Sequence, residues 1–139
     1  MKNTYFESIE RLNDGQTLAL QGLIDKLSFN DKGLIPVITQ DATSKDVLMM
    51  AWMNKESIAK TLATGRMTYW SRSRAHFWIK GETSGNIQAL VSMRIDCDGD
   101  ALLCLVNQTG GACHTGRDNC FYFKVDSANN LVTVLGSAG

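Results

Sequence analysis

The chain has 139 residues, with 14 basic and 14 acidic side chains, so its formal net charge is zero. This length suits one domain with a modest hydrophobic core. A balanced charge gives no overall attraction to nucleic acid or to an anionic membrane. No apolar run approaches the roughly 20 residues that cross a bilayer, and no apolar signal segment opens the chain. We therefore expect a soluble cytoplasmic protein with no nucleic-acid or membrane partner.

Two short amphipathic helices are expected within residues 1–32, which form an N-terminal helical extension. Apolar residues recur there at helical spacing in two sets, separated by the turn-forming Asn13-Asp14-Gly15. The sets are Tyr5, Phe6, Ile9 and Leu12, then Leu20, Leu23, Ile24 and Leu27. We expect the extension to serve packing or dimer contacts.

Residues 33–65 predict two strands and a helix. The apolar runs at residues 33–38 and 47–53 are typical of strands, and Pro36 belongs at a strand start or edge because it lacks a backbone donor. The methionines of the second run are expected in the core. Asn54 is a suitable N-cap for a helix that Gly65 would close.

A strand expected at residues 67–70 leads into four polar residues, Ser71, Arg72, Ser73 and Arg74. Alternation of serine and arginine in an extended segment would place both guanidinium groups on one face. Guanidinium groups bind phosphate oxygens bidentately. The segment is therefore either a phosphate site or a solvated basic turn.

The second half of the chain predicts a polar loop and a series of hairpins. Residues 80–86 resemble loops that hold ligands, with Lys80, Glu82, Thr83 and Ser84 as candidate binding residues. Strands are expected at residues 87–95 and 101–107, joined by an aspartate-rich turn, and at residues 121–125 and 131–135. The pattern predicts one compact α+β domain over residues 1–139, with a largely antiparallel β-sheet and a few short helices.

Three aspartates, Asp96, Asp98 and Asp100, crowd the turn between the two central strands. Carboxylates this close repel one another unless a cation or solvent screens them. Oxygen ligands suit Mg²⁺ or Ca²⁺, but Ala101 and Asn107 occupy the positions where an EF-hand needs Gly and Glu. The turn is therefore either a different hard-metal site or a solvated hairpin turn.

All four cysteines lie between residues 97 and 120. Thiolates select zinc, yet the absence of a C-x-x-C pair argues against a structural finger. Cys97, Cys113 and Cys120 would leave a fourth position open, as in catalytic sites where zinc lowers the pKa of bound water to about 7. His114 is then either a proton carrier or the fourth ligand. Cys104 lies in an apolar run and is expected in the core.

In this order, the motifs resemble the phosphoribosyl-AMP cyclohydrolase family of histidine biosynthesis. The similarity is carried by D-C-D-G-D at 96–100 and G-G-A-C-H-T-G-R-D-N-C-F-Y at 110–122. Its other motifs are G-L-I-P-V-I-T-Q-D at 33–41, V-L-M-M-A-W-M-N at 47–54, Y-W-S-R-S-R at 69–74 and W-I-K-G-E-T-S-G-N at 78–86, so it covers a core of residues 33–123. Asn86 stands where many relatives have His, so no proton-transfer role is assigned to it.

The resemblance implies that the enzyme hydrolyses the N1–C6 bond of the adenine ring in phosphoribosyl-AMP, using hydroxide generated at zinc. It also implies a homodimer in which Cys97 of one chain shares a zinc ion with Cys113 and Cys120 of its partner. Mg²⁺ is expected at the three aspartates, proton transfer at His114, and phosphate binding at the Ser-Arg segment. Some relatives carry a second, pyrophosphatase domain, but only a short segment follows Phe123, so we expect a monofunctional chain.

Two other protein classes share parts of the pattern. One is a binding module in which zinc only holds the fold together, and such a module would unfold on metal removal. A catalytic zinc site would instead leave a folded, inactive protein. The other is a nucleotide deaminase, whose H-x-E and P-C-x-x-C motifs do not occur here.

Overall fold

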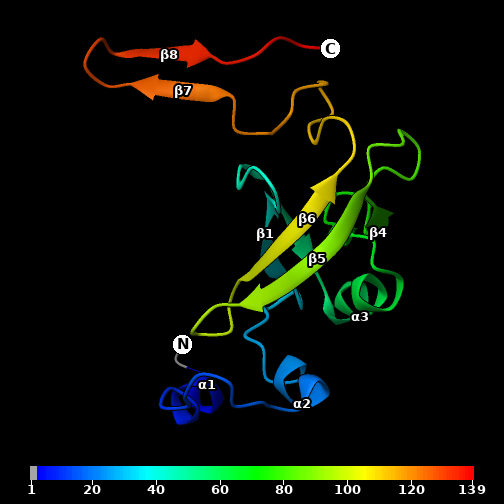
Figure 1. The fold of residues 1–139 in the computed structure, drawn as a ribbon, viewed down its shortest axis with the longest axis vertical. Coiled ribbons are helices and arrows are strands. Elements are labelled where there is room, and N and C mark those ends of the chain that lie inside the picture. Colours follow the sequence, from blue (N-terminus) through cyan, green and yellow to red (C-terminus); the bar gives the residue numbers. More distant parts are fainter. Residues whose placement is uncertain (1–2) are drawn as a thin grey trace.

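The computed structural model describes residues 3–139 and has the expected α+β class with mostly antiparallel strand pairs. Its helices are α1 (Thr4–Ser8), α2 (Leu20–Ile24) and α3 (Lys55–Thr64). Its strands are β1 (Ile35–Asp41), β2 (Val47–Met53), β3 (Thr68–Ser71), β4 (His76–Ile79), β5 (Gln88–Ile95), β6 (Leu102–Gln108), β7 (Phe123–Asp126) and β8 (Leu131–Val134). Figure 1 shows the β7–β8 hairpin at one end of the molecule and α1 and α2 at the other.

A four-stranded sheet in the order β2-β1-β6-β5 forms the centre of the fold. β1 pairs antiparallel with β2, and β5 antiparallel with β6. β1 and β6 pair in parallel, from Val37 opposite Leu102 to Asp41 opposite Val106. β6 therefore runs from the aspartate turn to the loop that holds Cys113. Its length keeps these two regions roughly 20 Å apart, at about 3.3 Å per strand residue.

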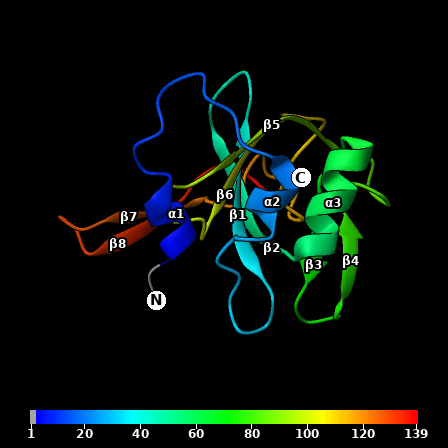
Figure 2. The ribbon, with the colours of Figure 1, turned by 90° about the horizontal axis from the view of Figure 1, so that it is seen from below.

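Helix α3 begins and ends where its sequence predicts. The Asn54 side chain accepts a hydrogen bond from the backbone N–H of Ser57 at 2.8 Å, and the Ser57 hydroxyl oxygen accepts one from the N–H of Asn54 at 2.8 Å. Gly65 closes the helix with a φ of 73°, in the left-handed region that favours glycine. The helices of the extension are also present but span only five residues each. Figure 2 shows α2 beside α3.

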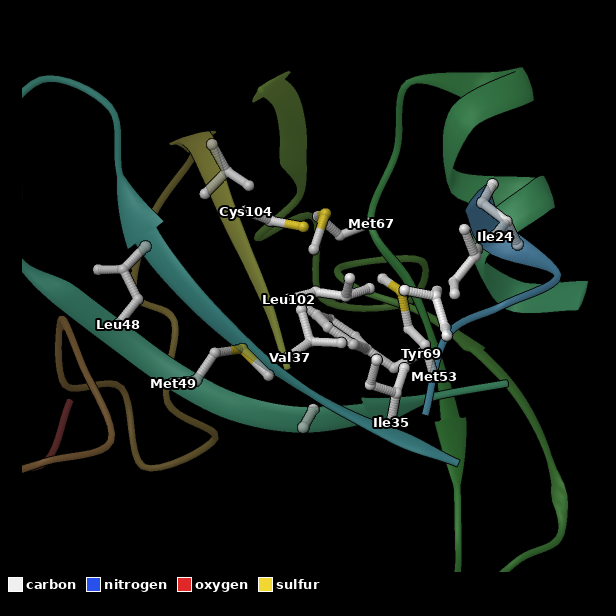
Figure 3. Packing of buried hydrophobic residues seen from close by; sticks show 14 of the residues in the cluster. Ile24, Ile35, Val37, Leu48, Met49, Met53, Met67, Tyr69, Leu102 and Cys104 are labelled. Carbon is white, nitrogen blue, oxygen red and sulfur yellow. The ribbon is translucent and has the colours of Figure 1, made fainter. Parts of the chain in front are cut away.

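The core is formed by alternate residues of the central strands together with side chains from the helices (Figure 3). Ile35 and Val37 of β1 are fully buried against Leu102 and Cys104 of β6. Burial raises the pKa of the Cys104 thiol to about 12. The expected core position of Cys104 is confirmed.

The β1–β2 pair departs in one detail from a uniformly buried pattern. Met49 and Met53 are buried, but Met50 is exposed because successive strand residues point to opposite faces of the edge strand β2. The expectation that all three methionines fill the core is therefore wrong for Met50. Pro36 lies near the start of β1, before pairing with β6 begins at Val37. Its missing donor is tolerated there, as expected.

A chain of buried polar side chains links β1, β3 and β5. The Tyr69 hydroxyl donates to Oε1 of Gln88 at 2.7 Å and lies 2.7 Å from Oγ1 of Thr39. Nε2 of Gln88 donates to Oε1 of Gln108 at 2.8 Å, which extends the chain to the end of β6. Burial raises the pKa of Tyr69 well above its usual value. Among the helices of residues 3–139, none has the length and apolar character needed to cross a bilayer.

Candidate active site

A tight loop directly after β6 holds Cys113 and Cys120. The backbone N–H of Cys113 donates to the Arg117 carbonyl at 3.1 Å, and that of Gly116 donates to the Cys113 carbonyl at 3.0 Å. The N–H of Cys120 donates to the Leu48 carbonyl at 2.7 Å, which fixes the end of the loop to β2. The cysteine loop, residues 110–120, is therefore anchored to the central sheet at both ends.

The thiols of Cys113 and Cys120 lie in the same loop, and each shifts the pKa of the other. Burial acts to raise the pKa of Cys113, but hydrogen bonds from Thr115 and Cys120 outweigh it and lower the pKa below its usual value. The Thr115 hydroxyl donates to the Cys113 sulfur at 3.1 Å. Burial and the neighbouring Cys113 raise the pKa of Cys120 to about 11. The pair offers two soft donors, and the pKa of one of them, Cys113, is lowered.

Lys80 connects the cysteine loop to the polar loop after β4. Its Nζ donates to the Ala112 carbonyl at 2.5 Å and lies 5.6 Å from the centre of the Trp78 ring. Burial lowers the pKa of Lys80, and the thiols of Cys120 and Cys113 oppose that shift. A cation is thus held next to the thiol pair.

A cleft of about 530 Å³ brings residues from three parts of the chain together. This volume lies within the range of small-molecule sites. The predicted site residues that line it are Arg74, Lys80, Glu82, Thr83, Ser84, Cys113 and His114. Phe77 and Trp78 of β4 also line it, although the sequence analysis gave them no functional role. An aromatic pair directly before a polar, glycine-containing loop was the available signal.

The arginines of the Ser-Arg segment do not lie on an extended strand, so the expected alternation is wrong. β3 ends at Ser71, and residues 72–75 form the turn into β4, where the N–H of Arg74 donates to the Ser71 hydroxyl at 3.2 Å. Ser71, Arg72 and Ser73 line a neighbouring cavity of about 570 Å³, and Arg74 lines both cavities. The Arg72 guanidinium lies 4.8 Å from the centre of the Trp52 ring. The turn thus keeps its cations beside the cleft.

The aspartate turn lies at the opposite end of β6. Oδ1 of Asp96 accepts a hydrogen bond from the backbone N–H of Asp100 at 2.9 Å. A hydrogen bond between their carboxyl groups raises the pKa of Asp100 above its usual value. Burial acts to raise the pKa of Asp96, but its hydrogen bonds to Asp100 outweigh burial and lower it. Cys97 and Asp98 are exposed, whereas Gly99 is buried.

Within residues 3–139, no three His, Cys, Asp or Glu side chains converge closely enough to hold a metal ion. Cys113 and Cys120 lie together, whereas Cys97 lies beyond the far end of β6. All four cysteines are free thiols. The three expected zinc ligands are therefore not brought together by one chain, and both metal assignments remain predictions.

Comparison with known proteins agrees with this arrangement of motifs. The family model for phosphoribosyl-AMP cyclohydrolase matches residues 49–122. A phosphoribosyl-AMP cyclohydrolase from Roseobacter denitrificans is 66% identical over 101 residues, which span 73% of this chain and 79% of that protein. One from Alcanivorax borkumensis is 56% identical over 126 residues, which span 91% of this chain and 88% of that protein. The chain therefore belongs to the phosphoribosyl-AMP cyclohydrolase family, a family of hydrolases of histidine biosynthesis.

Proposed function

We propose that this chain opens the adenine ring of phosphoribosyl-AMP by hydrolysing the N1–C6 bond, which gives the formimino carboxamide ribotide. The observation that carries the proposal is the shared cleft, in which Cys113 and His114 face the polar loop after β4 and the cation of Arg74. Aromatic side chains such as Trp78 offer a stacking surface for a base. The substrate has two phosphate groups, which suit the arginines of the neighbouring turn.

The thiol pair of Cys113 and Cys120 fits a zinc ion, because two soft sulfur donors in one loop are suited to that metal. We propose that the partner's Cys97 completes the donor set in a homodimer. The support is the length of β6, which separates Cys97 from the pair by roughly 20 Å within one chain. When bound, zinc acts as a Lewis acid that makes hydroxide available near neutral pH.

We assign Mg²⁺ to the aspartate turn. The Asp96 carboxylate accepts a hydrogen bond from the backbone N–H of Asp100, which keeps these two acidic residues close, and a cation would offset their mutual repulsion. A hard divalent cation suits such oxygen ligands, and Asp98, two residues from each, would have to turn its side chain toward them to supply a third carboxylate. In the proposed dimer this turn accompanies the partner's Cys97 to the cleft, where its cation would neutralise substrate phosphate.

The chain's own side chains supply binding and proton transfer. Hydrolysis adds water across the N1–C6 bond, so a proton must leave the attacking water and another must reach N1. His114 is exposed at the cleft next to Cys113. We propose that His114 accepts the proton from the attacking water and returns a proton to N1. Arg72 and Arg74 would hold phosphate, while Lys80 orients the cysteine loop through the Ala112 carbonyl. We also propose a cytoplasmic location, where thiol ligands stay reduced.

The test is ring opening of phosphoribosyl-AMP, followed by absorbance before and after chelation of zinc. We expect turnover in the metal-loaded protein, loss of turnover after chelation, and recovery when zinc is returned. Far-UV circular dichroism of the chelated protein should be unchanged, because the central core lies in the sheet and needs no metal. A metal-loaded protein that leaves phosphoribosyl-AMP intact would contradict the proposed reaction. Unfolding on chelation would instead favour a structural metal.

A further inference from the structure

The β7–β8 hairpin has one apolar face that no part of the described chain covers. Residues directly opposite in an antiparallel pair point to the same face, and the pairs on this face are Phe123 with Val134 and Val125 with Val132. Their exposed fractions are 62%, 52%, 71% and 58%. The opposite face carries Lys124, Thr133, Asp126 and Leu131. This alternation is typical of a sheet that packs against something on one side.

The hairpin has little support within its own chain. Neither of its strands makes an extensive contact with another helix or strand of residues 3–139. Two isolated strands are marginally stable in water and normally need a third strand or a packed face. A contiguous exposed patch of four large apolar side chains is also a common sign of a protein interface. The missing cover is therefore expected to come from another molecule.

An apolar groove lies at the other end of the molecule, beside Cys97. Phe6 and Ile9 of the N-terminal extension line it together with Leu23 and Ile95, and its volume is about 350 Å³. Glu10 and Asp96 add negative charge to its rim. The hairpin cannot reach this groove in its own chain, because helices α1 and α2, which supply Phe6 and Leu23 to the groove, lie at the opposite end of the molecule from β7 and β8 (Figure 1).

Chain connectivity brings the hairpin and the groove of two copies together. Phe123 follows Cys120 by three residues, so it lies within about 10 Å of Cys120 along the chain. If Cys120 and the partner's Cys97 bind one zinc ion, the hairpin must begin next to the groove that contains the partner's Cys97. Arg117, whose Nε donates to the Leu135 carbonyl at the base of the hairpin, carries a charge opposite to that of the groove rim.

We propose that the apolar face of the β7–β8 hairpin packs into the groove formed by Phe6, Ile9, Leu23 and Ile95 of a second copy of this chain. This inference rests on the shared zinc site of the proposed function and gives the N-terminal extension a role in building it. The contact occurs twice in a symmetric dimer, since each copy supplies one hairpin and one groove. Each hairpin then holds its own Cys113 and Cys120 over the partner's Cys97.

The test compares Val125→Asp on the apolar face with Thr133→Asp on the polar face as a matched control. Both positions are exposed, so neither change enters the core, and circular dichroism checks the fold. Val125→Asp should raise the dimer dissociation constant at least about 100-fold, because each dimer would bury two unpaired carboxylates. Thr133→Asp should leave it unchanged. Analytical ultracentrifugation and bound zinc per chain are the readouts.

Mixing two damaged chains tests the pairing of hairpin with groove. A Val125→Asp chain keeps its groove, and an Ile9→Asp chain keeps its hairpin, so their mixed dimer retains one intact contact. We expect dimer and bound zinc to reappear on mixing, although each variant alone has neither.

Persistent dimers of Val125→Asp with full zinc, or no recovery on mixing, would overturn the hairpin contact. That result leaves the proposed reaction standing if Cys97→Ser still loses zinc. Retention of zinc and activity by Cys97→Ser would instead overturn the shared site.

Discussion

The ring of Phe6 lies directly against Gly99 in the aspartate turn. A Cβ atom on Gly99 would come within 2.7 Å of the ring atoms Cδ2 and Cζ, and Gly99 also has a φ of 69°. The N–H of Ser28 donates to the Gly99 carbonyl at 2.7 Å, so both ends of the N-terminal extension contact this turn. The extension thereby fixes the segment that carries Cys97 and the aspartates.

Gly99→Ala should destabilise the protein by about 1 to 3 kcal/mol, because the added methyl group displaces the Phe6 ring and the backbone remains in the left-handed region. Gly85→Ala is the control, since Gly85 has a φ of 81° but no atom within 4 Å of the added carbon. Urea unfolding measures the stability of both variants. Equal losses of unfolding free energy in the two variants would show that backbone strain alone, without the Phe6 contact, accounts for the destabilisation.

Serine at any one of Cys97, Cys113 and Cys120 should abolish turnover and reduce bound zinc, because a hydroxyl is a poor ligand for this metal. Cys104→Ser should keep zinc and activity but lose about 1 to 3 kcal/mol of stability, since it buries a new hydroxyl. Metal analysis and the ring-opening assay are the measurements. Unchanged zinc in all three ligand variants would show that the assignment is wrong.

Cys97→Ala and Cys113→Ala chains, each inactive alone, should regain activity when they are unfolded and refolded together with zinc. A mixed dimer collects both lesions in one site and leaves the other site intact. Random pairing makes about half of the dimers mixed, so activity should reach about a quarter of the wild-type value. Native mass spectrometry confirms that mixed dimers form. Mixed dimers without activity would place all three ligands within one subunit.

Arg72→Ala and Arg74→Ala should each weaken substrate binding by about 1.5 to 3 kcal/mol per lost charge-assisted contact. Bound zinc should not change, because neither arginine is among the proposed zinc ligands. Arg66→Ala, an exposed arginine outside both cavities, serves as the control. Wild-type kcat/KM in both turn variants would contradict the proposal that Arg72 and Arg74 bind substrate phosphate.

Tyr69→Phe should lower the free energy of unfolding by about 1 to 3 kcal/mol, because Thr39 and Gln88 each lose a buried hydrogen-bond partner. The cost should depend on pH. Burial raises the pKa of Tyr69, whereas the unfolded chain loses the phenol proton near pH 10. The stability that the hydroxyl contributes is therefore complete below about pH 10 and is lost as the pH rises further. Urea unfolding from pH 7 to 11 should show the difference between the two proteins shrinking at the alkaline end; a constant difference contradicts this.

Local signals in the sequence predicted the elements whose chemistry is local. Asn54 and Gly65 mark the ends of α3 through hydrogen bonds and backbone conformation that involve only near neighbours. The β5–β6 hairpin and the burial of Cys104 likewise follow from alternation within one short segment. In the site, the candidate residues of the loop after β4 line one cleft together with Cys113 and His114, and the roles assigned to them remain predictions.

Features that depend on distant segments were not predictable in this way. The parallel pairing of β1 with β6 joins strands far apart in the chain, and no local pattern specifies that register. Gln88 is a polar residue that is fully buried only because Tyr69 and Gln108 satisfy it. Arg72 and Arg74 read as strand residues from alternation, yet the hydrogen bond from Arg74 to Ser71 favours a turn.

The parallel β1–β6 pairing also determines when the protein can fold during synthesis. β1 can pair with β2 as soon as both have left the ribosome, but its second edge stays unpaired until β6 emerges much later. An open, apolar strand edge invites pairing with other chains. Non-local strand pairing is also slow, because a long loop must close before the contacts form. The nascent chain therefore carries an aggregation-prone edge through most of its translation, and only the last third of the chain closes it.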